Sequence, residues 1–301
     1  MRIPLLFALL VFSWATMPLA LVWSVEDLTP VTSAWLRTTL ALILGLAVMG
    51  FLKIPLDRDL RSIRGYMVTL FATYGGLLLI FYAGQHVTSG VISIAIGCTP
   101  IFTALIARQV LREQHLGGIG MVGVLMCLIG LCLMFSVSAQ PGPDAYIATA
   151  LLAFGVLLFS FSIVLTKKVN PPGHPLAQAI GALLLSQPLF ALSWFIFDGN
   201  VPTIDWTSRS LFAVVYMAIM MSLVGYACYF YLLKHLPSST VTLGTYIAPL
   251  LAIFLGYQLN NEEFGTLSVS GGLMILLGLF VFRHANRWDE QLANSSARTD
   301  A

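Results

Sequence analysis

Long runs of apolar residues, separated by short polar segments, make up most of the chain. Each run is about 20 residues long, the length at which a helix crosses roughly 30 Å of hydrocarbon. Backbone groups in lipid must be hydrogen-bonded internally, so spans are helices or closed barrels, and the strict alternation of barrel strands is absent. The pattern predicts an all-α integral membrane protein with ten transmembrane helices, at about 3–23, 31–52, 65–85, 89–110, 115–136, 145–166, 175–197, 209–233, 239–260 and 264–283.

Composition agrees with this interpretation. Of the 301 residues, 58% are apolar and 9% are charged, against about 45–50% and about 25% in soluble globular chains. The linkers leave no room for a soluble catalytic domain, and only the tail at 288–301 is predicted to be disordered. The first apolar run resembles a signal peptide, but it is long and no small-x-small cleavage site follows it. We therefore interpret it as the first span.

The basic residues predict the orientation of the chain. If the N-terminus is cytoplasmic, the cytoplasmic segments hold Arg2, Lys53, Arg58, Arg61, Arg64, Arg108, Arg112, Lys167, Lys168, Lys234, Arg283, Arg287 and Arg298. Cytoplasmic loops are expected to be enriched in Lys and Arg. Arg209 lies at the edge of an outside loop, and Arg37 lies within the second span. Both termini are thus predicted to face the cytoplasm of a bacterial-type inner membrane. The net charge of +2, with no basic run, excludes nucleic acid as a partner.

The chain also contains an internal repeat. Ser89 to Glu113 matches Ser238 to Glu262 with an offset of 149 residues, and this aligns Pro100 with Pro249. The following segments, GVLMCLIG at 123–130 and GGLMILLG at 271–278, match with an offset of 148. Five helices in each half, at 1–140 and 141–287, require the second copy to enter the membrane from the opposite side. Such inverted repeats are typical of secondary transporters.

The segment Trp14 to Leu42, WATMPLALVWSVEDLTPVTSAWLRTTLAL, resembles the opening of the EamA family of the drug/metabolite transporter superfamily. There a Trp in helix 1 is followed by a polar loop, a Pro and an Arg early in helix 2. A Pro-centred helix closed by Glu, then a Gly-rich helix, resembles the end of each EamA repeat. The similarity covers about residues 3–284, although the second half has Gln178 where the helix-2 Arg would lie.

This resemblance implies a central cavity near the bilayer midplane and alternating access. It also implies cargo such as amino acids and their derivatives, other metabolites, drugs or, in some branches, vitamins such as riboflavin. Fold alone does not determine cargo. The matched prolines, with Gly97 and Gly244 nearby, are candidate kinks or hinges, because proline removes a backbone donor. The alternative is a harmless kink in a packed bundle.

An apolar pocket with a few polar groups suits a small organic ligand. The candidate cavity residues are Trp14, Arg37, Tyr74, Tyr82, Gln85, Ser93, Tyr226, Thr245 and Tyr246. Aromatic residues also form interfacial belts and ordinary packing. A charged side chain as deep in a span as Arg37 is energetically costly. Either it pairs with Glu26 or Asp27 or anchors at the interface, or it attracts an anionic substrate group.

The acidic residues are informative by their positions. None of the thirteen Asp and Glu lies in the middle of a predicted span, which argues against classic proton/cation-drug antiport through a buried carboxylate. Glu113 and Glu262 end matching helices on opposite faces, and we expect them to cap, anchor or gate. His86 is expected to be a turn residue that could titrate. The four cysteines lack metal-site spacing, so no cofactor or metal is predicted.

Three classes of function remain. The favoured one is a secondary permease for a small metabolite, acting by export or by import as in vitamin carriers, with the lipid bilayer and its substrate as partners. An intramembrane enzyme lacks an HExxH helix or paired intramembrane aspartates, and a sensor or scaffold lacks an output domain. The P-loop motif GxxxxGK[ST] does not occur, which excludes an ATP-driven pump in one chain. Because one chain contains both repeats, a monomer is sufficient to form the whole transporter. A homodimer is also compatible with the sequence.

Overall fold

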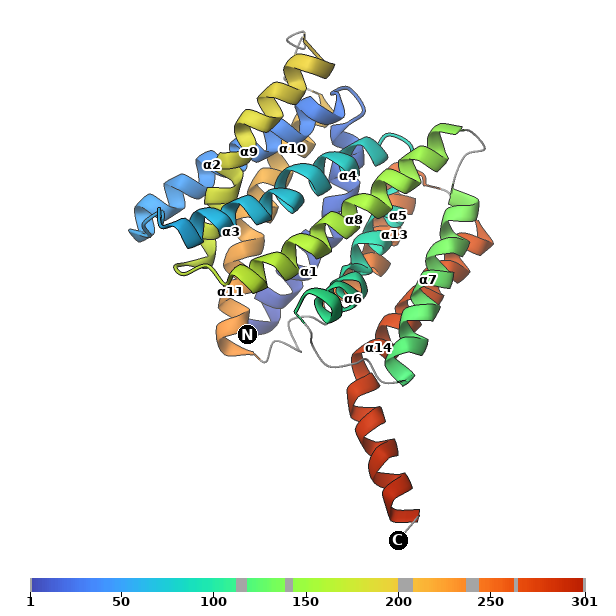
Figure 1. Cartoon of the computed structure of the whole chain (residues 1–301). Coiled ribbons are helices and arrows are strands. Elements are labelled where there is room, and N and C mark those ends of the chain that lie inside the picture. Colours follow the sequence, from blue (N-terminus) through green and yellow to red (C-terminus); the bar gives the residue numbers. More distant parts are fainter. Residues whose placement is uncertain are drawn as a thin grey trace.

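The computed structural model describes residues 2–111, 118–138, 143–199, 208–236, 244–262 and 265–299. Within these ranges all regular secondary structure is helical (Figure 1). The elements are α1 (Arg2–Ser24), α2 (Pro30–Leu52), α3 (Leu60–Leu70), η1 (Phe71–Gly76), α4 (Leu77–Ala83), α5 (Ser89–Gly97), α6 (Thr99–Val110), α7 (Gly118–Ser138), α8 (Pro143–Val169), α9 (Pro175–Phe197), α10 (Arg209–Ile219), η2 (Met220–Gly225), α11 (Tyr226–His235), α13 (Gly244–Asn260) and α14 (Thr266–Thr299).

Six of the described helical stretches are long and apolar enough to cross a membrane: Arg2–Ser24, Pro30–Leu52, Leu60–Ala83, Ser89–Val110, Tyr146–Val169 and Pro175–Phe197. Four further apolar helices are shorter: Gly118–Gly130, Arg209–Ile219, Ile247–Asn260 and Val269–Ala285. Large apolar side chains such as Phe51 and Phe195 are mostly exposed, as lipid-facing side chains would be. The prediction of an all-helical membrane protein is confirmed, whereas the count of ten spans stays a prediction.

Local sequence signals explain where helices begin. The Thr29 hydroxyl accepts a hydrogen bond from the Thr32 amide, and Pro30 follows at the first helical position of α2. The Asp59 carboxylate accepts from the Arg61 and Ser62 amides at the start of α3. Its pKa is lowered, first by the hydrogen bond from the Ser62 hydroxyl. Capping of this kind satisfies amide groups that have no partner inside the helix.

Helices at matching positions of the two halves pack against each other. The pairs are α2 with α9, α5 with α13, and α7 with α14. In addition, α1 packs on α10, η2 and α11, while α8 packs on α3, η1 and α4. The two π-helical segments η1 and η2 also lie 149 positions apart, the offset that the repeat has in the sequence. Each half therefore contributes equivalent contacts to the bundle.

The pair α7 and α14 depends on glycine. A Cβ atom at Gly123 would lie 2.8 Å from the Gly278 carbonyl oxygen, and one at Gly130 would lie 2.7 Å from the Gly271 carbonyl oxygen. The Cys127 thiol donates to the Ile275 carbonyl between them, at 3.3 Å. Small residues let backbones approach closely, which is how helices associate without a hydrophobic driving force in lipid. The two glycine-rich repeat segments thus form one antiparallel contact.

Polar contacts gather where α1 ends, α2 begins, α9 ends and α10 begins. The Thr32 hydroxyl donates to Asp198 at 2.8 Å, and the Ser210 hydroxyl donates to the Trp23 carbonyl at 2.8 Å. The Arg209 guanidinium forms an ion pair with Glu26. We call this the Glu26 end of the bundle. Its contacts join helices of the first half to helices of the second.

At the C-terminus the structure differs from the sequence-based expectation. The sequence predicts a disordered tail at 288–301, but α14 continues as helix through Thr299 and projects beyond the rest of the bundle (Figure 1). Extending an existing helix avoids the costly nucleation step, and Glu, Gln, Leu and Ala in this segment are good helix formers.

We expect Gly123→Ala and Gly278→Ala each to destabilise the protein by about 1–3 kcal/mol, because the added methyl group meets backbone atoms that cannot move aside. Gly50→Ala is the matched control, since a methyl group added there would have nothing within 4 Å. Thermal unfolding in detergent measures the effect. Equal melting temperatures for all three variants would contradict the close α7–α14 contact.

Candidate functional site

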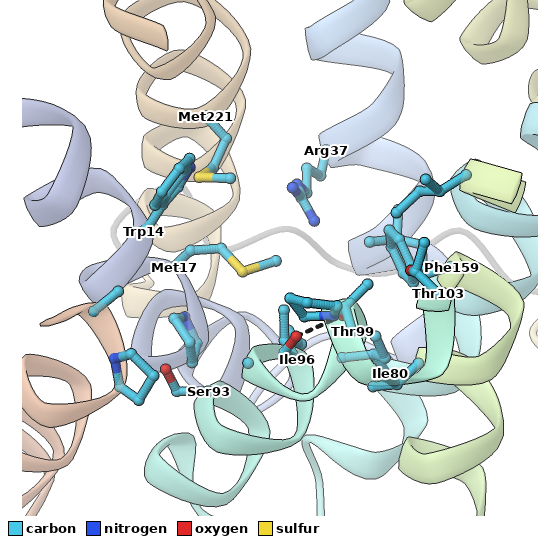
Figure 2. Close-up of a pocket in the computed structure, with 18 residues that line it drawn as sticks. Trp14, Met17, Arg37, Ile80, Ser93, Ile96, Thr99, Thr103, Phe159 and Met221 are labelled. Atoms are coloured by element: carbon cyan, nitrogen blue, oxygen red, sulfur yellow. Dashed lines mark hydrogen bonds between the residues drawn. The ribbon is translucent and has the colours of Figure 1, made fainter. Parts of the chain in front are cut away.

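A pocket of about 590 Å³ lies between helices of the two halves. The first half lines it from α1, α2, α4, α5 and α6, and the second half from α8, η2 and α13. Residues of these elements face one another across it (Figure 2). Its lining residues are Trp14, Met17, Pro18, Arg37, Leu77, Ile80, Ser93, Ile96, Gly97, Thr99, Pro100, Thr103, Val156, Phe159, Ile163, Met221, Ala248 and Pro249.

A second pocket of about 430 Å³ adjoins the first. The two share Trp14, Arg37, Leu77, Phe159 and Met221. The second pocket adds residues of η1 and α9, including Thr73 and Leu183. We call the two pockets together the Arg37 cavity, because Arg37 lies where they meet.

The walls of the Arg37 cavity are mainly apolar. Among its described lining residues, Arg37 is the only one with a charged side chain. Figure 2 shows its guanidinium extending from α2 into the space between Trp14 and Met17 on one side and Phe159 on the other. The guanidinium carbon lies 5.8 Å from the ring centroid of Phe81, close enough for a cation–π interaction. The cavity therefore combines an apolar surface with one positive charge.

Hydroxyl groups supply the remaining polarity. Ser93 and Thr103 line the first pocket. The Thr103 hydroxyl oxygen is buried and has no hydrogen-bond partner in the part of the chain that the structure describes. A buried polar atom without a partner costs about 1–3 kcal/mol. An occupant that hydrogen-bonds to Thr103 would recover this energy.

The acidic residues expected to pair with Arg37 have partners of their own. The Arg209 Nε atom donates to Glu26 at 2.9 Å, and the Arg209 guanidinium also stacks 4.8 Å from the Trp23 ring. The Asp27 carboxylate accepts from the Ser210 hydroxyl at 2.9 Å. Both contacts join the turn after α1 to the start of α10 at the Glu26 end. Arg37 lines both pockets.

Irregular helical segments surround the cavity. Met221 of η2 lines both pockets, and Thr73 of η1 lines the second. A π-helical turn departs from the regular i→i−4 hydrogen bonding and frequently occurs at functional sites. The helix predicted at 89–110 is interrupted at Cys98, where α5 ends and α6 begins, with Pro100 as the second residue of α6. At the matching position in the second half, α13 continues through Pro249.

The structure brings together six of the predicted residues at the cavity: Trp14, Arg37, Ser93, Gly97, Pro100 and Pro249. A Cβ atom at Gly97 would lie 3.6 Å from the Pro249 ring. Gly244 lies beside the cavity rather than in it, packed on α1, where its Cβ atom would meet Trp14 at 3.1 Å. The side chains of Tyr226, Thr245 and Tyr246 lie outside the part of the structure that is described.

Three other predicted residues do not line either pocket. The Tyr74 hydroxyl lies 2.6 Å from the Ser193 hydroxyl, and its ring packs edge-on against Phe190 at 5.0 Å. Tyr82 is partly buried nearer the end of α4, and Gln85 is exposed in the turn that follows. Sequence periodicity places Tyr74 and Tyr82 on a shared helix face, but it does not tell which neighbour that face meets.

Met17, Phe159 and Met221 line the cavity although the sequence does not single them out. Apolar side chains of this kind occur throughout every span, so the sequence does not distinguish these three as cavity residues. Thr103 offers a weak signal as a hydroxyl residue one turn after Pro100. A buried hydroxyl in a span needs a partner, and Thr103 lines the cavity.

A hydrogen-bonded network lies at the Glu26 end. Among the side chains that the structure describes, Glu262 is the only charged one that is fully buried, at 6% exposure. Its carboxylate accepts from the Ser89 amide at 3.0 Å, from the Ser89 hydroxyl at 2.9 Å and from the Asn260 amide group at 3.1 Å. The Trp23 indole donates to Asn260 at 2.8 Å. We call Trp23, Ser89, Asn260 and Glu262 the Glu262 network.

A glycine makes room for this network. A Cβ atom at Gly256 would clash with the Glu262 carboxylate and would lie 2.7 Å from the Ser89 hydroxyl. The Glu262 amide also donates to the Gly256 carbonyl at 3.1 Å, which folds the chain back after α13. The sequence-based expectation that Glu262 caps a helix is consistent with this geometry. Its counterpart Glu113 lies outside the described residues.

Comparison with known proteins agrees with the fold. The model of the EamA-like transporter family matches residues 1–136 and 146–283. The chain is 22% identical to the uncharacterized transporter YoaV of Bacillus subtilis, over 90% of this chain and 91% of that protein. It is 24% identical to the uncharacterized inner membrane transporter YedA of Escherichia coli, over 92% of this chain and 87% of that protein.

A solved crystal structure of a protein superimposes on this chain with a TM-score of 0.64. The two sequences are 17% identical, and the alignment covers 94% of this chain and 98% of the other. At this level of identity the likeness concerns the fold alone.

We expect Tyr74→Phe to destabilise the protein by about 1 kcal/mol, because it removes the hydrogen bond to the buried Ser193 hydroxyl. Tyr146→Phe is the control, since Tyr146 is 64% exposed. Denaturation in detergent micelles measures both. A Tyr74→Phe protein as stable as the control would show that this hydrogen bond does not hold η1 to α9.

Proposed function

The chain belongs to the EamA-like transporter family, and from that premise we propose that it moves a small organic solute with an anionic group through the Arg37 cavity. That the protein is a multi-pass membrane transporter follows from its family, its relatives and its apolar helices. The solute class and the route through the cavity are what we propose beyond this.

The position of Arg37 carries this proposal. A charged side chain in a mainly apolar cavity is costly, and Arg37 is the only charged one among the described lining residues. Guanidinium groups bind carboxylates through paired, charge-assisted hydrogen bonds. An anionic group of the solute placed beside Arg37 would form such hydrogen bonds with its guanidinium.

The rest of the cavity fits the organic part of such a solute. A volume of about 590 Å³ lies within the usual range for small-molecule sites, roughly 300–1,000 Å³. Trp14, Met17 and Phe159 supply an apolar surface, and Thr103 supplies an unused hydrogen-bonding group. The solute we propose is therefore a carboxylate, such as an amino acid or a related compound, with an apolar portion.

We propose further that the chain has ten spans in two inverted repeats and works by alternating access. The proposal is supported by the six long and four shorter apolar helices, by the 149-residue spacing of η1 and η2, and by the packing of matched helices. The cavity lies between the halves. Rocking one half against the other would expose such a cavity to each side in turn.

We expect Glu26 and Asp144 to face outside while Arg61 and Lys168 face inside, because basic residues concentrate on the cytoplasmic side. Single cysteines at these positions, tested with a membrane-impermeant thiol reagent in intact cells and in inverted vesicles, measure the arrangement. Labelling of positions 144 and 168 from the same side would overturn the ten-span arrangement.

We expect Arg37→Met to reduce movement of carboxylate-bearing solutes at least tenfold, because the solute loses its countercharge, and Arg37→Lys to retain part of the activity. Comparing metabolites inside cells and in the medium, with and without the overproduced protein, measures this and shows the direction of movement. Arg58→Met is the control, since Arg58 is exposed and lies outside the cavity. Equal solute profiles for the Arg37→Met and wild-type proteins would refute the proposed role of Arg37.

A further inference from the structure

The Glu262 network lies along the same helices as the cavity, displaced toward the Glu26 end. On α5, Ser89 belongs to the network, whereas Ser93 and Gly97 line the cavity. With a rise of about 1.5 Å per residue, these lie about 6 Å and about 12 Å further along the helix. On α1, Met17 lies about 9 Å from Trp23 by the same measure. The network therefore lies between the cavity and the Glu26 end along these two helices.

The network also alternates between the two halves. Ser89 and Trp23 belong to the first half, and Asn260 and Glu262 belong to the second. Separation of α5 from the segment after α13 would open this end, and it would break both hydrogen bonds from Ser89 to Glu262. These bonds thus oppose opening directly.

The start of α5 has an unusual cap. Thr88 has φ −71° and ψ 156°, the extended conformation of an N-cap residue, but its side chain makes no capping hydrogen bond. Its hydroxyl oxygen is buried and has no hydrogen-bond partner among the described residues. Glu262, in the segment that follows α13, accepts the Ser89 amide instead. Two acceptors thus lie at one helix start, and one of them is unused.

We propose that the Glu262 network is the gate at the Glu26 end of the cavity, and that it opens when the cap of α5 changes from Glu262 to Thr88. The proposal rests on the alternating-access function proposed above. With the gate closed, Glu262 caps α5 and the Thr88 hydroxyl has no partner. With the gate open, Thr88 caps the first turn of α5 and Glu262 is hydrated in the opened space.

This exchange keeps the closed and open states close in energy. If Glu262 left with no replacement, the Ser89 amide and hydroxyl would lose their acceptor, and a buried group left so costs about 1–3 kcal/mol. Thr88 can instead accept from the Gly90 or Val91 amide in the same first turn after a side-chain rotation alone, since its backbone already has the N-cap conformation, while the Ser89 amide is hydrated in the opened space. Opening therefore exchanges one helix cap for another and does not leave the helix uncapped.

Gly256 supports the closed state. Any side chain at this position would push against the Glu262 carboxylate and the Ser89 hydroxyl. Gly256→Ala therefore displaces the carboxylate without changing Glu262 itself. This gives a second, independent way to open the gate.

The test uses thiol labelling at the cavity. The reporter is Ser93→Cys, in a full-length protein whose four native cysteines are replaced by alanine, because Ser93 lines the cavity one turn beyond Ser89. Intact cells are treated with a membrane-impermeant maleimide, and the rate of labelling is measured. Inverted vesicles show that the same cysteine reacts from the other side.

We expect Glu262→Gln and Gly256→Ala each to raise the labelling rate in cells at least fivefold, because both weaken the closed gate. Thr88→Val keeps the shape of the side chain but removes the alternative cap, so we expect it to lower the rate at least threefold. Asp144→Asn is the control, since Asp144 is exposed in the first turn of α8, outside the network. Each variant is first checked for a monodisperse, folded state in detergent.

The outcomes are separable. Unchanged labelling in Glu262→Gln and Gly256→Ala would overturn the gate. Faster labelling in those two variants with no effect of Thr88→Val would overturn the exchange of caps. Because labelling needs no solute, a failure of the Arg37 prediction would count against the proposed cargo and leave this test unaffected.

Discussion

Hydrogen-bond satisfaction in an apolar surrounding is the constraint on which this structure depends. Hydrocarbon offers no partner to a backbone amide or carbonyl group, so every span must satisfy these groups internally. The described chain meets this requirement with helices alone. Since lipid gives little hydrophobic drive for helices to associate, close glycine contacts such as Gly123 on Gly278 and side-chain bonds such as Trp35 to Gln187 hold the helices together.

The same constraint makes a buried polar group without a hydrogen-bond partner informative. Polar groups inside the bundle mostly have partners: Gln187 accepts from both Trp35 and Thr39, and Tyr74 bonds to Ser193. Within the described ranges, the hydroxyls of Thr103 and Thr88 have no partner. One faces the cavity and the other lies at the start of α5. The proposed transport cycle would supply a partner to each of them. The solute would bind the Thr103 hydroxyl, and an amide in the first turn of α5 would bind the Thr88 hydroxyl.

Irregular helical segments line the cavity together with regular helices. The π-helical segments, the interruption at Cys98 and the chain reversal after α13 all lie where the two halves meet. A fully regular helix moves as a rod, whereas a break or a π-turn lets one part of a helix move relative to the rest. The arrangement fits a protein in which a cavity opens at alternating ends while most helix contacts persist.

The sequence alone was sufficient to predict the helical membrane fold, the internal repeat and the family, because 20-residue apolar runs and matched Pro, Gly and Glu positions survive without three-dimensional information. It also named Trp14, Arg37 and Ser93 as candidate cavity residues, and all three line the first pocket. Only the tertiary structure showed that Tyr74 packs against Phe190 and does not line the cavity. It also brought Met221 and Phe159 to the cavity. It joined Glu262 to Ser89, which lie 173 positions apart in the chain. Periodicity defines a helix face, but which neighbour that face meets depends on the rotation and packing of every other helix.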